Sequence, residues 1–574
     1  MFISGEHRFN KTNEQLREIQ GTPYTAYWAS DVVLSAFKKS HLVGDVSEPR
    51  VGMATANNDR FIRLWFEVNR NKFGINISSR KEAVESRKKW FPFAKGGEQR
   101  KWYGNNDTVV NWENDGFEIQ NFKDEKTGRI RSHNYNLDYI FSSALTWTVI
   151  GTEKTSFRFC PVGFLYSNSG YGLFCNNEKT KYYLLGFMNS KIAASLLKIL
   201  SPSMGFESGY LRKLPLIESD SLDSIVERVK HCIDGSNAEW DSFEISWDFK
   251  KHPLLRNVST ISEAFTQWQS ECDDRFNQLK ANEEELNRIF IDIYGLQDEL
   301  TPEVEDKDVT VRKADLQRDI KSLLSYAVGC MFGRYSLDVE GLAYAGGEWD
   351  SSKYQSYIPD ADNVIPITDE EYLDDDIVSR LCAWLKAVYG ADTLEANLDY
   401  IAKALGNKGS TSREIIRNYF LNDFFKDHCQ TYSVTGSGKR PIYWLFDSGK
   451  QNGFKALVYL HRYTPDTIGN LRIDYLHKMQ RVYESEINRM QDMMDHSENA
   501  REVAAASKRK DKLAKQLKEC REYDEKISHL ALSRIELDLD DGVKVNYRKL
   551  QTAQDGKFYE VLADSKNIMV KEKK

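Results

Sequence analysis

Closely spaced cysteines are missing from this 574-residue chain. No two cysteines form a Cys-x-x-Cys pair, and no cysteine–histidine cluster has zinc-finger spacing. This spacing predicts reduced, buried thiols and gives no reason to expect a disulfide framework or a metal site. The eight cysteines are Cys160, Cys175, Cys232, Cys272, Cys330, Cys382, Cys429 and Cys520.

Long uninterrupted hydrophobic runs are also missing. The most apolar stretch, YYLLGFMNSKIAASLLKIL at residues 182–200, is broken by Asn, Ser and Lys, so we expect no transmembrane helix. The N-terminal segment MFISGEHRFNKTNEQ has no apolar core of signal-peptide length. We therefore expect a cytoplasmic protein that makes no contact with a membrane.

Motifs that mark common catalytic and nucleotide-binding sites are absent as well. The sequence contains no GxGxxG, GxxxxGK[ST], His-Glu-x-x-His or Gly-x-Ser-x-Gly motif. It also lacks Asn-Pro-Pro-Tyr and its Asp-Pro-Pro-Tyr and Ser-Pro-Pro-Tyr variants, with which amino-methyltransferases hold a flipped adenine. We assign no catalytic residue and expect this chain, alone, to be inactive as an enzyme.

Charge, by contrast, is plentiful and unevenly distributed. Residues 1–217 hold 30 Lys and Arg against 21 Asp and Glu, a net charge of +9, whereas residues 218–574 hold 49 against 65, a net charge of −16. A basic module on an acidic body is expected when the module faces a polyanion, and equally when surface charge merely varies. The composition, 41% hydrophobic and 29% charged, is that of a globular chain.

Turn signals and apolar periodicity predict an α+β multidomain protein. In the C-terminal part, KRPIYWLFDSGKQNGFKALVYL predicts a β-hairpin, and LDLDDGVKVNYRKL predicts a strand with a turn. Apolar residues at intervals of three and four after residue 475 predict an antiparallel helical hairpin. The expected order is a lead-in at 1–50 with a helix capped near Ser30 or Asp31, a mixed α/β domain at 51–217, a helical domain at 218–345, an α/β accessory domain at 346–465, the helical hairpin at 466–535 and a tail at 536–574.

One basic and aromatic stretch favours nucleic-acid binding. RVGMATANNDRFIRLWFEV, residues 50–68, places amides and hydroxyls beside arginines and a tryptophan, and SRKEAVESRKKWFPFAKGGEQRKWYGNN and DEKTGRIRSHNYN follow it. Lysine and arginine neutralise phosphates, while Asn and Gln amides suit adenine edges and Arg suits guanine. Trp90, Phe91, Trp102 and Tyr103 either line a groove or belong to the core. A charged surface over a β-rich core would have the same composition.

The order of the motifs resembles a known family. GMATANNDRF resembles the G-x-x-T-G-x-N-x-x-F opening of target recognition domains in TaqI-type and type IIG DNA methyltransferases. YLLGFMNSKIAASLLKIL resembles their Leu-Leu-x-x-Leu-Asn-Ser helix, and GYLRKLPLI their closing Leu-Pro segment. Longer stretches, among them KKWFPFAKGGEQRKWYGNNDTVVNWENDG and ELNRIFIDIYGLQDELTPEV, are similar to the adenine-specific DNA methyltransferases of type 1 BREX phage-defence systems.

The resemblance implies a target recognition domain at 51–217 that binds double-stranded DNA. The complete enzyme would transfer a methyl group from S-adenosylmethionine to adenine N6. No cofactor is implied for this chain, because the cofactor-binding and Asn-Pro-Pro-Tyr motifs would lie before residue 1, in a methyltransferase part on the same or a separate chain. Other implied partners are further BREX proteins and phage DNA-mimic inhibitors, and the resemblance implies a bacterial or archaeal source.

The resemblance also assigns site residues. Thr55, Asn57 and Asn58 are expected on a loop near the duplex with Arg60 and Arg63 close by, and Phe61 and Trp65 are expected to anchor that loop. Ala56 replaces the family's glycine, so the turn there either avoids a left-handed conformation or is strained. Expected phosphate contacts, which set affinity and salt dependence while the amides add specificity, are Arg87, Lys88, Lys89, Lys95, Arg100, Lys101, Arg129 and Arg131.

Two other functions stay open. One is a scaffold or regulatory protein of the same defence system, whose helical hairpin at 466–535 binds partners. The same apolar spacing is equally that of an intramolecular hairpin, which we expect. The other is the specificity part of a type IIG restriction–modification enzyme, whose cleavage domain would also lie outside this chain.

Overall fold

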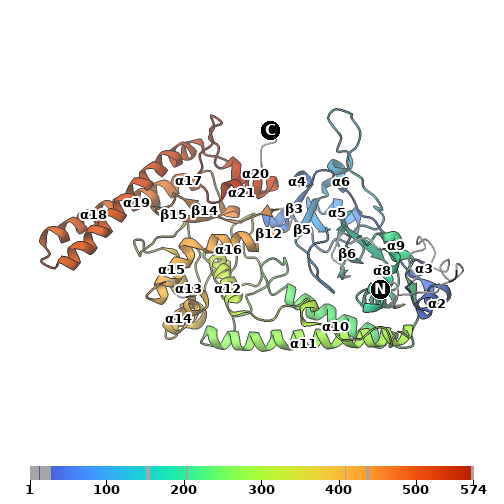
Figure 1. Ribbon diagram of the computed structural model, residues 1–574. Coiled ribbons are helices and arrows are strands. Elements are labelled where there is room, and N and C mark those ends of the chain that lie inside the picture. Colours follow the sequence, from blue (N-terminus) through green and yellow to red (C-terminus); the bar gives the residue numbers. More distant parts are fainter. Residues whose placement is uncertain are drawn as a thin grey trace, which may run out of the picture. The chain divides into compact units, whose positions relative to one another are not determined.

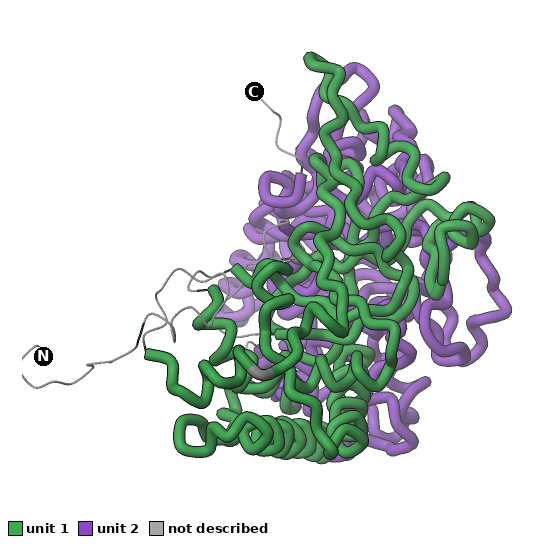
Figure 2. The backbone as a smooth tube through the Cα atoms, turned by 90° about the vertical axis from the view of Figure 1, so that its right-hand side faces the viewer, with its two compact units in different colours: residues 1–65, 72–241, 270–313 green, residues 66–71, 242–269, 314–574 purple. Residues whose placement is uncertain are grey.

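The computed structural model describes residues 12, 28–149, 156–201, 205–406, 409–434 and 438–569. The first 27 residues of the predicted lead-in lie outside the described residues, except Thr12. The chain divides into two compact units, which Figure 2 colours separately. Unit 1 comprises Met1–Trp65, Lys72–Asp241 and Ser270–Lys313, and unit 2 comprises Phe66–Asn71, Ser242–Gln269 and Ala314–Lys574.

Two four-stranded sheets organise unit 1. One has the order β2–β9–β6–β7 and is antiparallel throughout. The other has the order β3–β5–β4–β8, in which β4 and β8 run parallel and the other pairs antiparallel. The strands are β1 (His41–Leu42), β2 (Glu48–Arg50), β3 (Ile62–Leu64), β4 (Trp90–Ala94), β5 (Thr108–Asn111), β6 (Ala144–Thr148), β7 (Phe157–Cys160), β8 (Leu165–Tyr166), β9 (Gly170–Phe174) and β10 (Pro215–Leu216), which pairs with β1.

Several helices of unit 1, among them α2, α4, α5, α7 and α8, begin at a side-chain cap. Ser30 caps α2 by accepting the Val33 N–H at 3.2 Å, which confirms the predicted start. The apolar stretch at 182–200 forms two helices bent by 75°, because Ser190 caps a new helix after the first has ended. The helices are α2 (Asp31–Lys39), α3 (Val43–Val46), α4 (Asn58–Phe61), α5 (Arg80–Glu85), α6 (Glu113–Gln120), α7 (Glu178–Met188), α8 (Lys191–Leu200), α9 (Ser208–Arg212), α10 (Leu222–Trp240) and α11 (Ile261–Tyr294), whose first residues belong to unit 2.

Among the described helices, none is by itself long and apolar enough to cross a bilayer, and α7 and α8 meet the required length and composition only as a bent pair.

Unit 2 combines a three-stranded sheet with helices. The predicted β-hairpin is confirmed: β14 (Tyr443–Asp447) pairs antiparallel with β15 (Lys455–Tyr459). The remaining strands are β11 (Ile365–Pro366), which pairs with β15, and the pair β12 (Ser433–Val434) and β13 (Gly438–Lys439). The helices outside the C-terminal hairpin are α12 (Leu316–Met331), α13 (Ile377–Tyr389), α14 (Leu394–Leu405), α15 (Ser412–Asn422), α16 (Phe424–Thr431), α17 (Thr467–Asn470), α20 (Gly542–Lys549) and α21 (Ser565–Ile568).

The predicted helical hairpin is also confirmed, and it is intramolecular. A short π-helix, Leu471–Leu476, leads into α18 (His477–His496), which lies beside α19 (Ala500–Ser533) in Figure 1. Met479 and Tyr483 on α18 and Leu513 and Cys520 on α19 are buried. The apolar spacing is therefore used within the chain, and the hairpin carries no evidence of its own for a partner.

The strand predicted in the tail is wrong. Residues 542–549 form helix α20, in which Val543, Asn546 and Tyr547 are buried. Their spacing of three and four, continued by buried Leu550, is that of one helix face and outweighs the β-propensity of the valines.

A carboxyl group is buried inside unit 2 with few partners. Glu244 is 3% exposed, and its Oε2 accepts hydrogen bonds from the hydroxyls of Ser325 at 2.8 Å and Tyr432 at 3.2 Å. Its other oxygen has no hydrogen-bond partner among the described residues. Burial raises the pKa of Glu244 to about 7 despite these hydrogen bonds and the nearby Arg334.

Candidate nucleic-acid interface

The loop at residues 52–58 is fixed by backbone contacts on both sides. Ala54 exchanges hydrogen bonds with His133, at 2.8 and 2.9 Å, and the Met53 N–H donates to the Tyr166 carbonyl at 2.7 Å. At Gly52 an added Cβ would lie 2.1 Å from the Tyr166 oxygen, so only glycine fits this close approach. The predicted anchors, Phe61 and Trp65, are buried.

The turn at Ala56 is left-handed. Its φ is 59°, in the region where a Cβ costs about 1–2 kcal/mol and glycine is preferred. We expected the turn at Ala56 either to avoid a left-handed conformation or to be strained, and the structure shows the strained, left-handed turn. The strain is local, because Ala56 itself is exposed.

The three polar residues of the loop are hydrogen-bonded within the loop. The Asn57 Oδ1 accepts the Arg60 N–H at 3.1 Å and so caps α4. The hydroxyl of Thr55, which is buried, donates to the Asn58 Oδ1 at 2.6 Å. Each carboxamide oxygen therefore accepts one hydrogen bond inside the loop and keeps a second lone pair, so both side chains can still donate to a ligand and accept from it.

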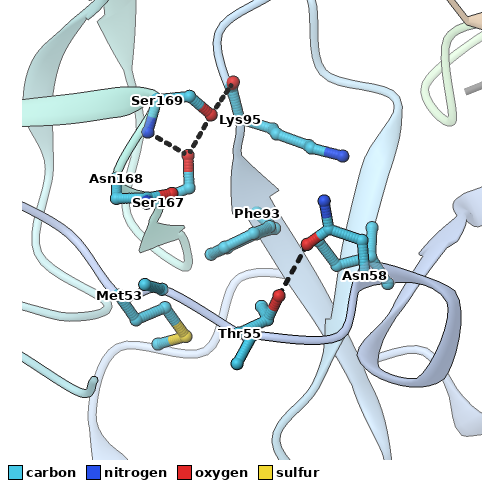
Figure 3. Close-up of a pocket in the computed structure, with 11 residues that line it drawn as sticks. Met53, Thr55, Asn58, Phe93, Lys95, Ser167, Asn168 and Ser169 are labelled. Carbon is cyan, nitrogen blue, oxygen red and sulfur yellow. Dashed lines mark hydrogen bonds between the residues drawn. The ribbon is translucent and has the colours of Figure 1, made fainter. Parts of the chain in front are cut away.

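A cavity of about 340 Å³ opens beside this loop, where Thr55 and Asn58 face Lys95 and the turn after β8 (Figure 3). The turn is held by Ser167, whose Oγ accepts the N–H groups of Ser169 at 3.1 Å and Gly170 at 2.9 Å. The Ser169 hydroxyl donates to the Lys95 carbonyl at 2.8 Å. Among the described residues that line the cavity none is acidic, so Lys95 gives it a positive charge.

Two arginines on different segments meet at one aromatic ring. The guanidinium of Arg60 lies 5.3 Å, and that of Arg131 5.8 Å, from the centre of the Phe122 ring. Phe122 packs edge-on against buried Phe61, with ring centres 5.2 Å apart. The Arg60 Nε also donates to Glu118 at 2.7 Å, in an ion pair whose side chains are about half exposed. The exposed ion pair and an exposed ring contact are each worth about 1 kcal/mol or less, so both position Arg60, and the Phe122 ring is the contact that Arg60 and Arg131 share.

A second pair of predicted cations meets at Trp90. The Arg63 guanidinium and the Lys89 ammonium lie 5.4 and 5.5 Å from the centre of the Trp90 ring, which is buried at the start of β4. Arg63 Nη1 also donates to the carbonyls of Asp59 and Ile62 at 2.7 Å. Lys89 and Lys95 flank the two ends of β4. Because a strand rises by about 3.3 Å per residue, the two lysines are roughly 20 Å apart.

The segment 122–131 forms a narrow ribbon, which Figure 1 shows as a loop projecting beyond α6. The Arg131 N–H donates to the Phe122 carbonyl and the Asp124 N–H to the Arg129 carbonyl. The Asp124 carboxylate accepts the N–H groups of Thr127 and Lys126, and the Thr127 N–H in particular holds the pKa of Asp124 below its usual value. Arg129 and Arg131 are exposed on this ribbon.

Arg100 and Lys101 do not lie on this surface. The Arg100 guanidinium is buried against Glu239 of α10, and its Nε donates to the Tyr103 carbonyl at 2.7 Å. The Lys101 Nζ pairs with buried Glu283 of α11 at 2.8 Å. Burial alone would raise the pKa of Glu239, but Arg100 and Arg312 together lower it, so the carboxylate is ionised.

We predicted phosphate contacts for Arg100 and Lys101, but both side chains instead form ion pairs with buried carboxylates inside unit 1. Their counter-charges lie more than a hundred residues away in the sequence, so no local pattern reveals them. Of the other predicted cations, Arg87 is exposed with a φ of 52° after α5, and Lys88 is half-buried before β4.

Sequence reasoning missed residues that position the cations or line the cavity. Phe122 gave no signal beyond one aromatic residue beside a basic turn. Ser167 and Ser169 lie in an Asn/Ser/Gly stretch, which predicts a turn but does not indicate a cavity. Within the described ranges, no group of three or more His, Cys, Asp or Glu side chains could hold a metal ion.

By fold and surface, the chain is a mixed α/β multidomain protein with a cationic, amide-bearing recess on one sheet. No protein-family model matches it. It is 47% identical over 555 residues to the adenine-specific methyltransferase PglX of Lacticaseibacillus casei (strain Zhang), a match that covers 95% of this chain and 45% of that protein. It is 35% identical, over an alignment of 590 residues, to the adenine-specific methyltransferase BrxX of Escherichia coli O9:H4 (strain HS), covering 97% of this chain and 46% of that protein.

The chain thus belongs to the PglX/BrxX family of adenine-specific methyltransferases, and the resemblance read from its motifs is confirmed. It spans about half the length of the curated relatives that it matches.

Proposed function

We propose that this chain is the DNA target-recognition portion of an adenine-N6 DNA methyltransferase of a BREX phage-defence system. The observation that carries the proposal is the gathering of Arg60, Arg63, Lys89, Lys95 and Arg131 around one sheet of unit 1 and its recess. The net positive charge of residues 1–217 and the similarity to adenine-specific methyltransferases support the proposal.

Within this surface the residues divide into two roles. The cations neutralise phosphates, which sets affinity and its dependence on salt. Thr55, Asn57 and Asn58 belong to the part that discriminates between base sequences, because amide groups beside a recess can contact base edges. Arg100 and Lys101 support the module from inside and make no contact with DNA.

The residues present do not fit S-adenosylmethionine, which supplies the methyl group in such enzymes. β4 and β8 are the parallel pair among the described strands, and each is followed in the chain by another strand where a cofactor-binding α/β fold has a helix. We propose that the cofactor is bound by the part of the relatives that this chain does not span, and we derive no methyl-transfer step.

The proposal extends to partners. A methyltransferase part, on the same or another chain, would receive the adenine turned out of the duplex. Further BREX proteins would meet the acidic remainder of the chain, and phage DNA-mimic inhibitors would compete for the cationic surface because they present negative charge as DNA does.

The test is selection of bound duplexes from a random pool by the purified chain, followed by anisotropy at several salt concentrations. We expect one short motif and an affinity that falls steeply with salt. Replacing Lys88 and Lys89 with Ala should weaken binding to all duplexes alike and flatten the salt slope by up to about 2 units. Lys307→Ala is the matched control, because Lys307 is an exposed lysine of unit 1 paired with Glu305.

Two results would overturn the proposal. Absence of any salt-sensitive binding would favour the scaffold function. Reproducible fragments after prolonged incubation of DNA with magnesium would favour a nuclease.

A further inference from the structure

We propose that Phe117 is a wedge that enters the bound duplex and stacks between two neighbouring base pairs, opening that step. This inference rests on the proposed DNA binding and adds a deformation of the DNA to it. Two features of Phe117 carry the inference. Its side chain is 68% exposed, more than any other aromatic side chain among the described residues, and a left-handed turn directly precedes it in the chain.

The three residues before Phe117 all have a left-handed backbone. The φ values of Asn114, Asp115 and Gly116 are 51°, 58° and 70°, and the right-handed part of α6 resumes at Phe117. This conformation is unfavourable for a residue with a Cβ, although Asn and Asp tolerate it better than most. Such strain persists only where the surrounding structure holds it, and it is found above all at functional positions.

The turn is held from two sides. Arg80 donates to both carboxylate oxygens of Asp115, from Nε at 2.9 Å and from Nη2 at 2.5 Å. At Gly116 an added Cβ would lie 2.5 Å from the ring of buried Trp112, so only glycine fits there. Single apolar side chains are often exposed on protein surfaces without such support. The backbone that carries Phe117 is instead fixed to the core of unit 1.

Phe117 also stands next to the cations of the candidate interface. The carboxylate of Glu118, the following residue, accepts from Arg60 Nε at 2.7 Å. Phe122, five residues further along, has the guanidinium groups of Arg60 and Arg131 at its ring. A polyanion that these arginines attract therefore comes into the neighbourhood of the exposed Phe117 ring.

In DNA, the large apolar surfaces that suit an exposed ring are the faces of the bases, which stack on one another inside the duplex. Phenylalanine and other apolar side chains reach them by entering a base step from the minor groove, which partly unstacks the step and bends the DNA. Phosphate contacts made by nearby arginines help to offset the cost of unstacking. The steps that open most easily are TA and CA/TG, and each of them contains an adenine.

The experiment therefore places 2-aminopurine, which fluoresces more strongly when it is unstacked, at each adenine of the duplex recovered in the selection. Fluorescence and anisotropy are measured for the unaltered chain, Phe117→Ala, Phe117→Leu and the control Val162→Ala. Val162 is another exposed apolar side chain of unit 1. Thermal melts check that the variants fold, and because Phe117 is exposed we expect its replacement to leave the melting temperature unchanged.

We expect the unaltered chain to raise the fluorescence at one adenine position. Phe117→Ala should lose this rise and weaken binding about 5- to 150-fold, the range for an aromatic side chain stacked on a base. Its salt slope should stay the same, because no phosphate contact is lost. Phe117→Leu should keep part of the rise, since leucine also acts as a wedge, and Val162→Ala should keep all of it.

Three results would overturn the inference. Binding without a rise at any adenine would mean that every tested step stays closed. A rise that Phe117→Ala keeps would assign the unstacking to another residue. Equal affinity and fluorescence of Phe117→Ala and the unaltered chain would leave the Phe117 ring to a contact with another protein. Failure of the unaltered chain to bind any DNA would instead refute the proposed function itself.

Discussion

Replacing Arg100 with methionine separates the structural role of this residue from the phosphate contact that its sequence context predicts. The Arg100 side chain is 10% exposed and its partner Glu239 is 1% exposed. Breaking a buried pair by removing one partner costs about 3–5 kcal/mol, because the other charge stays buried. Arg312 also contacts Glu239, at 2.5 Å, and compensates in part. Methionine keeps the apolar stem, so we expect a loss near the lower limit, about 3 kcal/mol.

The assay is a pair of measurements on the same variant. A loss of about 3 kcal/mol lowers the melting temperature of a unit of this size by roughly 6–12 °C. The salt slope of DNA binding should stay unchanged, because no phosphate contact is lost. A second variant, Arg100→Met with Glu239→Gln, should recover part of the stability, since it removes the uncompensated charge.

Arg129→Ala is the control, because Arg129 is exposed on the 122–131 ribbon. It should leave the melting temperature within about 1 °C and reduce the salt slope by about one unit. The reasoning is refuted if Arg100→Met has the same melting temperature as the unaltered chain and a flatter salt slope, because Arg100 would then contact a phosphate.

Three further predictions concern single positions. Ala56→Gly should raise the free energy of unfolding in urea by about 0.5–1 kcal/mol, since relief of the left-handed strain exceeds the entropy cost of glycine; a decrease would mean the turn is unstrained. Phe122→Ala should weaken DNA binding about 3- to 30-fold by releasing Arg60 and Arg131, whereas Phe122→Tyr should not; equal effects would exclude the ring as their support. Glu244 has its pKa raised to about 7, so it stabilises the protein below pH 4.5 and this stability is lost as pH rises to about 7, by roughly 3 kcal/mol. Glu244→Gln should flatten that pH dependence in denaturant titrations, and an unaltered profile would contradict the burial argument.

Local patterns predicted several elements correctly. The β-hairpin at β14 and β15 and the cap at Ser30 depend on contacts between residues close in the sequence, and α18 and α19 each carry their own apolar spacing. Such contacts leave a direct trace in turn residues, capping residues and apolar spacing. Elements of this kind are therefore visible before the fold is known.

Contacts between distant residues could not be predicted in this way. Arg100 and Lys101 stand in a run of exposed-looking cations, and only the fold brings Glu239 and Glu283 to them. The same holds for Phe122, whose ring receives Arg60 from a segment some sixty residues earlier. For the candidate site, sequence reasoning therefore found the charged groups but neither their internal partners nor the recess.

The ion pairs of Arg100 with α10 and of Lys101 with α11 limit how sequence specificity can be exchanged between relatives. In a host that lacks carboxylates at the positions of Glu239 and Glu283, a cassette cut at residues 51–217 would leave Arg100, Lys101 and Trp102 without their partners. The transplanted cations would then be buried without counter-charges, and the grafted module would be unstable whatever bases it reads. The smallest exchangeable cassette is therefore discontinuous and includes 218–241 and 270–313. Its seam at residue 270 falls inside the 34-residue helix α11, so a swap there must keep the helix unbroken.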